Sequence, residues 1–323
     1  MTQVLSILQA AIVFGTVILY GAMGEILTEK SGNLNLGVPG IMYLGGIAGL
    51  AGSFLYETSC AAPNGFVGLL IALACALIAS ALAGLLYSFL TITLRANQNV
   101  TGLTLTIFGS GVANLFGGAM NKMAGGVGQI SVAATSGAFR ATLPFLSQIG
   151  VFSGLGFMTY AAIVLAILLH RFLNKTRKGL NLRAAGEDPA TADAAGISVT
   201  RYKYLAISIG SAITGMGGLY YVMDYIKGTW ANDGGIEKLG WLAVALVIFS
   251  RWKSPHAIWG SYLFGALFWL YFYIPGLTRS SQEIFKMLPY IVTIVVLVVV
   301  SLKKSRENEP PASLGLPYFR EER

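Results

Sequence analysis

Long apolar runs recur along almost the whole chain, and they constrain its fold more than any other feature. Candidate membrane spans lie at about 7–27, 35–56, 66–94, 99–119, 151–173, 203–223, 238–250, 256–274 and 286–302. A helix of about 20 apolar residues crosses the roughly 30 Å hydrocarbon core of a bilayer. Only helices and closed barrels satisfy every backbone polar group there, and continuous rather than alternating runs favour helices. The pattern predicts an all-α, polytopic transmembrane helical bundle of about 8–10 spans.

The content and placement of charge agree with a membrane protein. Charged residues make up 11% of the chain, against about 25% in soluble domains. The net charge of +8 does not indicate nucleic-acid binding, because the basic residues fall in short loops between spans, where they set topology. If the 174–202 loop faces the cytoplasm, the alternation of spans puts 28–34, 95–98, 251–255 and the C-terminal tail on the same side. The other side then holds only six of the 22 Lys and Arg residues, namely Lys122, Arg140, Lys227, Lys238, Arg279 and Lys286. This asymmetry predicts an N-terminus outside and a C-terminus inside.

The sequence contains none of the common catalytic or nucleotide-binding motifs. It has no phosphate-binding loop, no dinucleotide fingerprint and no zinc-protease motif. The two cysteines, Cys60 and Cys75, suggest neither a disulfide framework nor a metal site. We therefore expect no catalytic residue, no metal and no cofactor in this chain.

A polar, basic and helix-capable segment, 178–203, stands between two apolar runs. Asp188 can cap a helix whose first position is Pro189, and Gly196 can end that helix after about two turns. The small side chains of Ala190 and Ala194 would let its exposed face enter a groove on a partner. An ordinary amphipathic loop helix is the alternative. The segment favours a transporter subunit that another, cytoplasmic protein drives.

Three stretches of the chain carry a resemblance to one group of membrane proteins. The run Arg183–Ile197 (RAAGEDPATADAAGI) resembles the cytoplasmic coupling segment of ABC importer permeases for branched-chain amino acids, simple sugars and nucleosides. The stretch Gly24–Met42, with its Ser-Gly-Asn-Leu-Asn-Leu-Gly core, is similar to the first-to-second span junction of the nucleoside and simple-sugar branch. Leu94–Thr101 (LRANQNVT) is similar to that branch's entry to its fourth span. Pro39 departs from the pattern, since the family often has an acidic residue there.

The resemblance implies a type II-like permease that works with several other proteins. In a bacterial plasma membrane, an extracytoplasmic solute-binding lipoprotein would deliver the solute, for which the resemblance favours a nucleoside. Two permease chains, here a heterodimer in which this chain is the shorter member, would form the path through the membrane lipid. Cytoplasmic ATP-binding subunits would bind ATP and drive transport. We call residues 183–197 the coupling segment and expect its contacts from Arg183, Gly186, Glu187, Asp188, Pro189, Ala190, Ala194, Gly196 and Ile197.

Polar residues inside spans are the candidates for contact with solute, because placing them in lipid is costly. The candidate path residues are Asn33, Asn35, Asn99, Thr101, Thr104 and Asn114. Hydrogen bonds between helices are an equally good explanation of them. The same architecture serving simple sugars or branched-chain amino acids remains an alternative.

An ion-coupled secondary transporter is the alternative from another class. Such a transporter would require a carboxylate near the middle of the membrane to bind the coupling ion. In this chain, the acidic residues Glu25, Glu57, Asp224 and Glu237 are expected in loops or at span ends. We further expect a permease domain over 1–303 and a disordered cytoplasmic tail over 304–323. The region 120–150 could hold an interfacial helix.

Overall fold

The computed structural model describes residues 2–126, 130–141, 154–303 and 309–319, and in these ranges the regular structure is entirely helical. The helices are α1 Thr2–Glu29, α2 Val38–Ser59, α3 Gly65–Ser88 with its π-helical extension η1 Phe89–Thr93, α4 Gln98–Met123, α5 Ala133–Phe139, α6 Phe157–Lys175, α7 Arg177–Glu187, α8 Pro189–Ala194, α9 Val199–Tyr220 with η2 Tyr221–Tyr225, α10 Gly235–Phe249, α11 Ser254–Trp269 with η3 Leu270–Tyr273, α12 Arg279–Lys286 and α13 Leu288–Lys303. The predicted all-α polytopic bundle is confirmed.

The number of helices that can span a bilayer is smaller than the sequence suggests. Within the described residues, six helices are long and apolar enough, and there are seven spans if α12 and α13, bent by 40° at their junction, count as one. The runs at 238–250 and 256–274 instead form α10 and α11, of 15 and 16 residues. Each is shorter than the roughly 20 residues that a straight span needs. Hydropathy predicts where these helices are, but not that each ends early.

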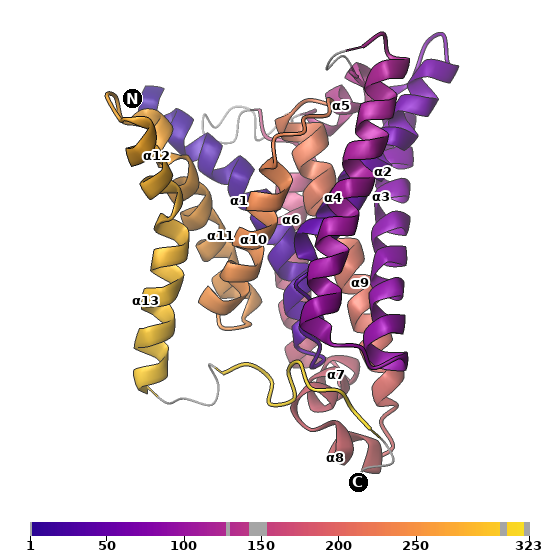
Figure 1. Cartoon of the computed structure of the whole chain (residues 1–323), viewed down its shortest axis with the longest axis vertical. Helices are drawn as coiled ribbons and strands as arrows, with labels where there is room; N and C mark the ends of the chain where they lie inside the picture. The colour runs from indigo at the N-terminus through magenta and orange to yellow at the C-terminus, as the bar shows by residue number, and fades with distance from the viewer. Residues whose placement is uncertain (1, 127–129, 142–153, 304–308, 320–323) are drawn as a thin grey trace.

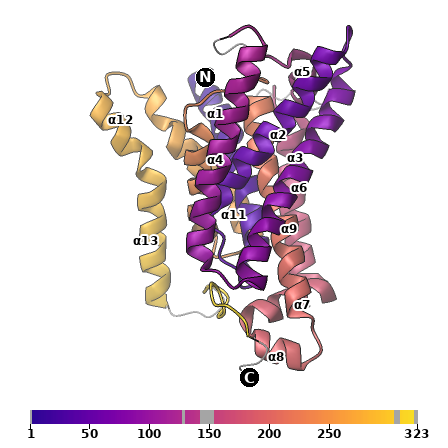
Figure 2. The ribbon, with the colours of Figure 1, turned by 45° about the vertical axis from the view of Figure 1, so that its right-hand side comes forward.

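Helix α9 lies at the centre of the bundle and packs against α1, α2 and α3 (Figures 1 and 2). Small residues permit this close approach. A Cβ on Gly215 of α9 would overlap Ser80 of α3, and one on Gly45 of α2 would overlap the backbone of Gly215. Close packing of small residues is a main source of helix association in lipid.

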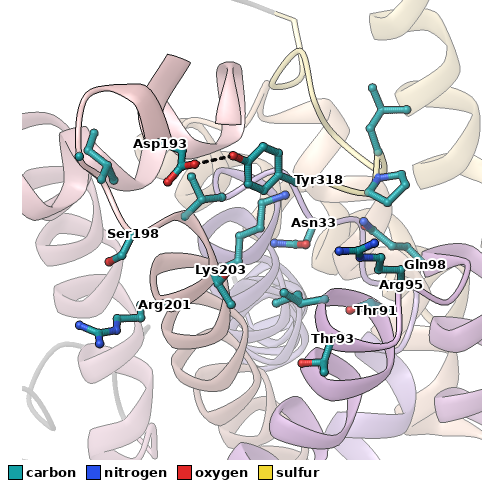
Figure 3. A pocket seen from close by; sticks show the side chains of 17 residues that line it. Asn33, Thr91, Thr93, Arg95, Gln98, Asp193, Ser198, Arg201, Lys203 and Tyr318 are labelled. Carbon is teal, nitrogen blue, oxygen red and sulfur yellow. Dashed lines mark hydrogen bonds between the residues drawn. The ribbon is translucent and has the colours of Figure 1, made fainter. Parts of the chain in front are cut away.

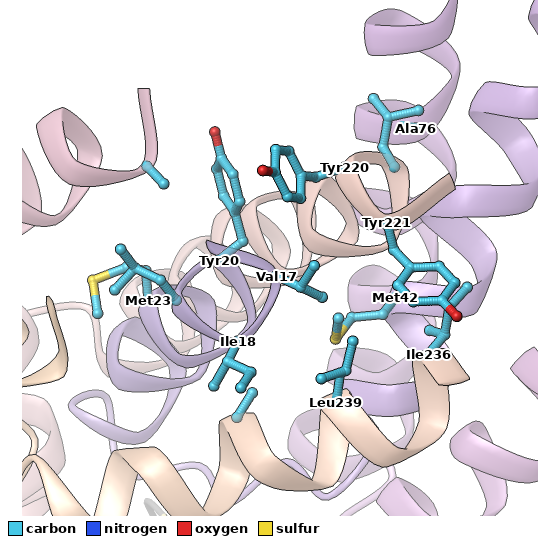
Figure 4. Close-up of a cluster of buried hydrophobic side chains, with 14 of the residues drawn as sticks. Val17, Ile18, Tyr20, Met23, Met42, Ala76, Tyr220, Tyr221, Ile236 and Leu239 are labelled. Carbon is cyan, nitrogen blue, oxygen red and sulfur yellow. The ribbon is translucent and has the colours of Figure 1, made fainter. Parts of the chain in front are cut away.

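The apolar core lies where α1, α2, α9 and α10 meet. Figure 4 shows Val17, Met42, Tyr220 and Leu239 of these helices converging. Tyr20 belongs to the same cluster, and its hydroxyl donates to the carbonyl oxygen of Met158 at 2.9 Å. That bond satisfies the polar end of a ring that is otherwise packed among apolar groups.

The segments predicted to share one side of the membrane lie at one end of the bundle. Figure 1 shows α7, α8 and the C-terminus at its lower end and the N-terminus at its upper end. The α1–α2 turn, the α10–α11 turn and α7 meet there, because Lys30, Trp252 and Arg183 line one cavity. At the opposite end, α5 is a seven-residue helix within the uncertain 120–150 region. Residues 127–129 and 142–153 of that region lie outside the described residues.

The C-terminal tail differs from expectation. Residues 309–319 are not disordered but cross the lower end of the bundle, and we call them the strap (Figure 2). The backbone N–H of Gly315 donates to the carbonyl oxygen of Gly32 at 3.2 Å, and that of Ser313 donates to Gly186 at 3.2 Å. The strap is rich in proline and has no regular spacing of apolar residues, so the sequence alone predicts no helix or strand there. It is ordered by backbone contacts to other segments. Residues 304–308 and 320–323 lie outside the described residues.

Glu25, Glu57, Asp224 and Glu237, the acidic residues weighed above, lie in loops or near span ends as expected, but Glu25 and Asp224 are buried. Glu25 is 1% exposed and Asp224 is 8% exposed. A carboxylate oxygen of Glu25 accepts the backbone N–H of Asn35 at 3.0 Å, so this carboxylate helps to fix the α1–α2 turn. Neither residue lies near the midpoint of its helix.

Candidate functional site

The coupling segment contains the capped short helix that the sequence predicts. The Asp188 carboxylate accepts the backbone N–H of Thr191 at 3.0 Å, and Pro189 occupies the first turn of α8. Gly196 follows with φ of +83°, a left-handed conformation that glycine adopts without steric cost. Hydrogen bonds from Thr191 to the carboxylate lower the pKa of Asp188. The ionised cap therefore stabilises the start of α8.

The outer face of the coupling segment is exposed and made of small or acidic side chains. Glu187, Asp188, Ala190, Ala194 and Gly196 are all exposed. The segment's remaining predicted residues, Arg183, Pro189 and Ile197, are partly buried, and Gly186 is buried. The exposed surface can thus meet a partner at close range.

The inner face of the coupling segment contacts the α1–α2 turn backbone to backbone. A Cβ on Gly186 would overlap the carbonyl oxygen of Lys30 and lie 3.0 Å from the nitrogen of Gly32. Only glycine leaves room for this approach. The contact joins two of the three stretches that the sequence singles out, Arg183–Ile197 and Gly24–Met42. A displacement of the segment would therefore be transmitted directly to α1 and α2.

Beside this contact lies a cavity of about 370 Å³. It is lined by Lys30, Arg183, Glu187 and Trp252, among others. Burial lowers the pKa of the Lys30 ammonium, and the nearby Glu187 carboxylate opposes this effect. The indole N–H of Trp252 donates to the buried carboxylate of Glu29, which ties the α10–α11 turn to the end of α1.

The structure separates the candidate path residues into two groups. Asn33 and Asn35 are buried in the α1–α2 turn. The Asn33 amide donates to the Ser31 hydroxyl at 2.8 Å, and the Asn35 side-chain oxygen accepts the N–H of Gly37 at 2.9 Å. Both side chains hold the turn in shape.

The other candidate path residues lie on α4. Asn99 and Thr104 are exposed, while Thr101 is partly buried and donates its hydroxyl hydrogen to the carbonyl oxygen of Asn97 at 2.8 Å. Asn114 is partly buried, and its side-chain oxygen has no hydrogen-bond partner among the described residues. This exposed face of α4 also carries large apolar residues, including Ile107, at 73% exposure. The path role of both groups stays a prediction.

Comparison with known proteins places the chain in a family. The family model described as "Branched-chain amino acid transport system / permease component" matches residues 6–297. The chain belongs to this family. It is a permease of an ABC transporter, a non-catalytic transport component and a multi-pass membrane protein.

Similar curated proteins bear the names of sugar and nucleoside permeases. A putative glucose ABC transporter permease protein of Haloferax volcanii is 29% identical, and the alignment covers 98% of each chain. A nucleoside ABC transporter permease protein of Lactococcus lactis is 29% identical over 89% of this chain and 90% of that protein. A guanosine ABC transporter permease protein of Bacillus subtilis is 28% identical over 99% of each chain. No solved structure matches the chain.

Sequence reasoning missed two features at the end of the bundle that carries α8. The first is that Glu25 and Glu29 are both buried. They stand four residues apart, on one face at the end of the apolar α1, and this spacing was the available signal. Tyr318 in the strap donates its hydroxyl hydrogen to the Asp193 carboxylate of α8 at 2.9 Å. No pattern in the tail foretells that bond, since it depends on a contact between residues far apart in sequence.

Proposed function

We propose that this permease is half of the membrane path of an ATP-driven nucleoside importer. Two observations support a separate ATP-binding subunit. The given sequence holds no phosphate-binding loop, and α8 presents a capped, exposed face of small residues. In this proposal, ATP-binding subunits dock on the coupling segment and ATP binds to them. Closure of those subunits moves α8, and the Gly186 contact carries the motion to the α1–α2 turn.

The orientation belongs to the same proposal. Lys30, Arg95, Arg183 and Lys253 gather at the end of the bundle that carries α8. Positive charge favours the cytoplasmic side, so this end faces the cytoplasm and the N-terminus lies outside. A solute-binding lipoprotein would dock at the opposite end. A reporter fused after Arg323 should then read as cytoplasmic, and an external signal would reverse the assignment.

A second permease chain would complete the path. The exposed face of α4 carries Asn99 and Thr104 among large apolar side chains, a mixture better suited to a protein partner and a solute than to lipid alone. Lactococcus lactis has two nucleoside permease proteins that resemble this chain, the second at 27% identity over 44% of it. Two related permeases in one organism support a heterodimer.

Nucleosides are the favoured cargo because the Asn33-Leu-Asn35 motif resembles the nucleoside branch, and because nucleoside permeases recur among the relatives. Simple sugars are the second candidate, favoured by the similarity to the putative glucose permease of Haloferax volcanii. Polar side chains of the path would hydrogen-bond the solute only weakly, and the external binding protein would provide selectivity.

Uptake of labelled uridine and adenosine, in cells with and without this gene, tests the proposal. Unlabelled nucleoside, glucose, ribose or leucine is added in excess as competitor. Loss of uptake on deletion, with competition by nucleosides alone, is the expected result. Competition by glucose or ribose would transfer the assignment to sugars. Unchanged uptake of labelled uridine and adenosine on deletion would reject the cargo assignment.

A further inference from the structure

A second cavity, of about 680 Å³, lies at the same end of the permease as the coupling segment (Figure 3). Its walls come from the start of α9, the stretch Thr91–Arg95, the end of α8 and the strap residues Leu316–Tyr318. This volume is within the roughly 300–1,000 Å³ typical of small-molecule sites. The cavity is therefore large enough for a ligand the size of a lipid headgroup.

Lys203 is a buried cation in the wall of this cavity. Its side chain is 3% exposed, and Figure 3 shows it reaching from α9 toward Tyr318 and Asn33. Within the part of the chain that the structure describes, its ammonium group forms no hydrogen bond and no ion pair. A buried charge without a counter-charge is strongly unfavourable. An anion beside the ammonium group would offset this cost.

Other positive groups face the same space. Figure 3 shows the Arg95 guanidinium directed toward Asn33 and Lys203, whereas that of Arg201 points away. Arg95 lies 4.5 Å over the ring of Phe319 and has φ of +58°, a backbone conformation uncommon for arginine. The surrounding structure thus holds Arg95 in place at the rim of the cavity.

The N-terminus of α9 adds a partial positive charge. Ser198 is the N-cap residue of this 22-residue helix and makes no side-chain capping bond. Helix N-termini with free N–H groups attract phosphate groups. Among the described residues that line the cavity, the sole carboxylate is that of Asp193, which accepts a hydrogen bond from Tyr318.

We propose that this cavity binds the phosphate group of an anionic ligand, held by Lys203, Arg95 and the N-terminus of α9. The phosphate would belong either to the headgroup of a membrane lipid or to a soluble phosphate compound. Because the walls include both α8 and the strap, the bound anion would link the coupling segment to the strap. Occupancy would therefore stiffen the surface on which the ATP-binding subunits are proposed to act.

The test uses the full-length chain, purified in a non-ionic detergent and stripped of lipid. Thermal unfolding is followed against inorganic phosphate at constant ionic strength, with chloride as the control anion. The same titration is repeated with mixed micelles that contain phosphatidylglycerol, with phosphatidylcholine as the zwitterionic control. Native mass spectrometry counts the bound lipids.

Lys203→Met is the decisive variant, because it keeps an unbranched chain and removes the buried charge. Lys178→Met, at an exposed position of α7, is the matched control. Loss of one charge-assisted contact should weaken binding by roughly tenfold or more in Lys203→Met and leave it unchanged in Lys178→Met. Arg95→Gln serves as a second variant, should Lys203→Met fail to fold.

Each outcome bears on the proposal. Saturable binding of inorganic phosphate that Lys203→Met weakens would support a soluble ligand. Saturable binding of phosphatidylglycerol alone, weakened in the same way, would support a lipid. Absence of saturable binding to both probes would overturn the proposal, as would equal binding by the wild type and both the Lys203→Met and Arg95→Gln variants. The result does not depend on which solute the permease carries.

Discussion

Gly186→Ala should uncouple the coupling segment from the transmembrane helices. The added Cβ would overlap the carbonyl oxygen of Lys30. It would also lie 3.1 Å from the carbonyl carbon of Lys30 and 3.0 Å from the backbone nitrogen of Gly32. Ordinary van der Waals contact begins near 3.4 Å. The atoms it meets belong to the backbone, so no side-chain rotation can relieve the overlap.

The size of this effect follows from two opposing terms. Overpacking costs typically about 1–3 kcal/mol. Replacing a helical glycine with alanine returns roughly 0.5–1 kcal/mol through helix propensity. With the middle of each range, about 2 and about 0.75 kcal/mol, the net destabilisation of the docked segment is about 1.25 kcal/mol, which raises the population of the undocked form by a factor of roughly eight.

Hydrogen exchange on the purified chain measures this change directly. We expect faster exchange in 183–197 and in the 30–37 turn, together with reduced transport and normal membrane insertion. Gly111→Ala on α4 is the matched control for hydrogen exchange, because a Cβ there meets nothing within 4 Å. Exchange in Gly186→Ala equal to that of the control, together with transport equal to that of the wild type, would refute the argument that this backbone contact transmits motion.

Three further substitutions test other contacts. Because hydrogen bonds lower the folded-state pKa of Asp188, its cap should be complete above the usual aspartate pKa and be lost as the pH falls through the lowered value; exchange in α8 should show this acid dependence in the wild type but not in Asp188→Asn. Tyr318→Phe removes the bond to Asp193 and should cost about 0.5–1.5 kcal/mol, seen as faster proteolysis of the strap, and unchanged cleavage would contradict that. Gly218→Ala, which would press on the backbone of α2, should lower the unfolding temperature relative to Gly111→Ala through an overpacking cost of about 1–3 kcal/mol.

The sequence predicts local structure in this permease well. Asp188, Pro189 and Gly196 define α8 because capping, proline and a left-handed glycine act within a few residues. The long apolar runs predict α1 to α4 as well, because a straight helix needs about 20 apolar residues to cross the bilayer.

Features that depend on contacts between distant segments could not be predicted. The backbone approach of Gly186 to the α1–α2 turn is one example, and the order of the strap is another. Hydropathy also overestimates the spans at α10 and α11, because a protein core can bury a shorter apolar helix as well as lipid can. Asn35 illustrates the same limit. Its side-chain oxygen accepts the backbone N–H of Gly37 within the α1–α2 turn, a contact that the polarity of the residue alone does not reveal.

The strap has a consequence for the order in which the protein folds. The backbone N–H of Gly315 donates to the carbonyl oxygen of Gly32, so the α1–α2 turn obtains this hydrogen bond only after α13 has been synthesised. The contact of Tyr318 with Asp193 of α8 likewise forms only after α13 has been made. The surface where the driving subunits are proposed to bind is therefore completed later than the helices of the bundle.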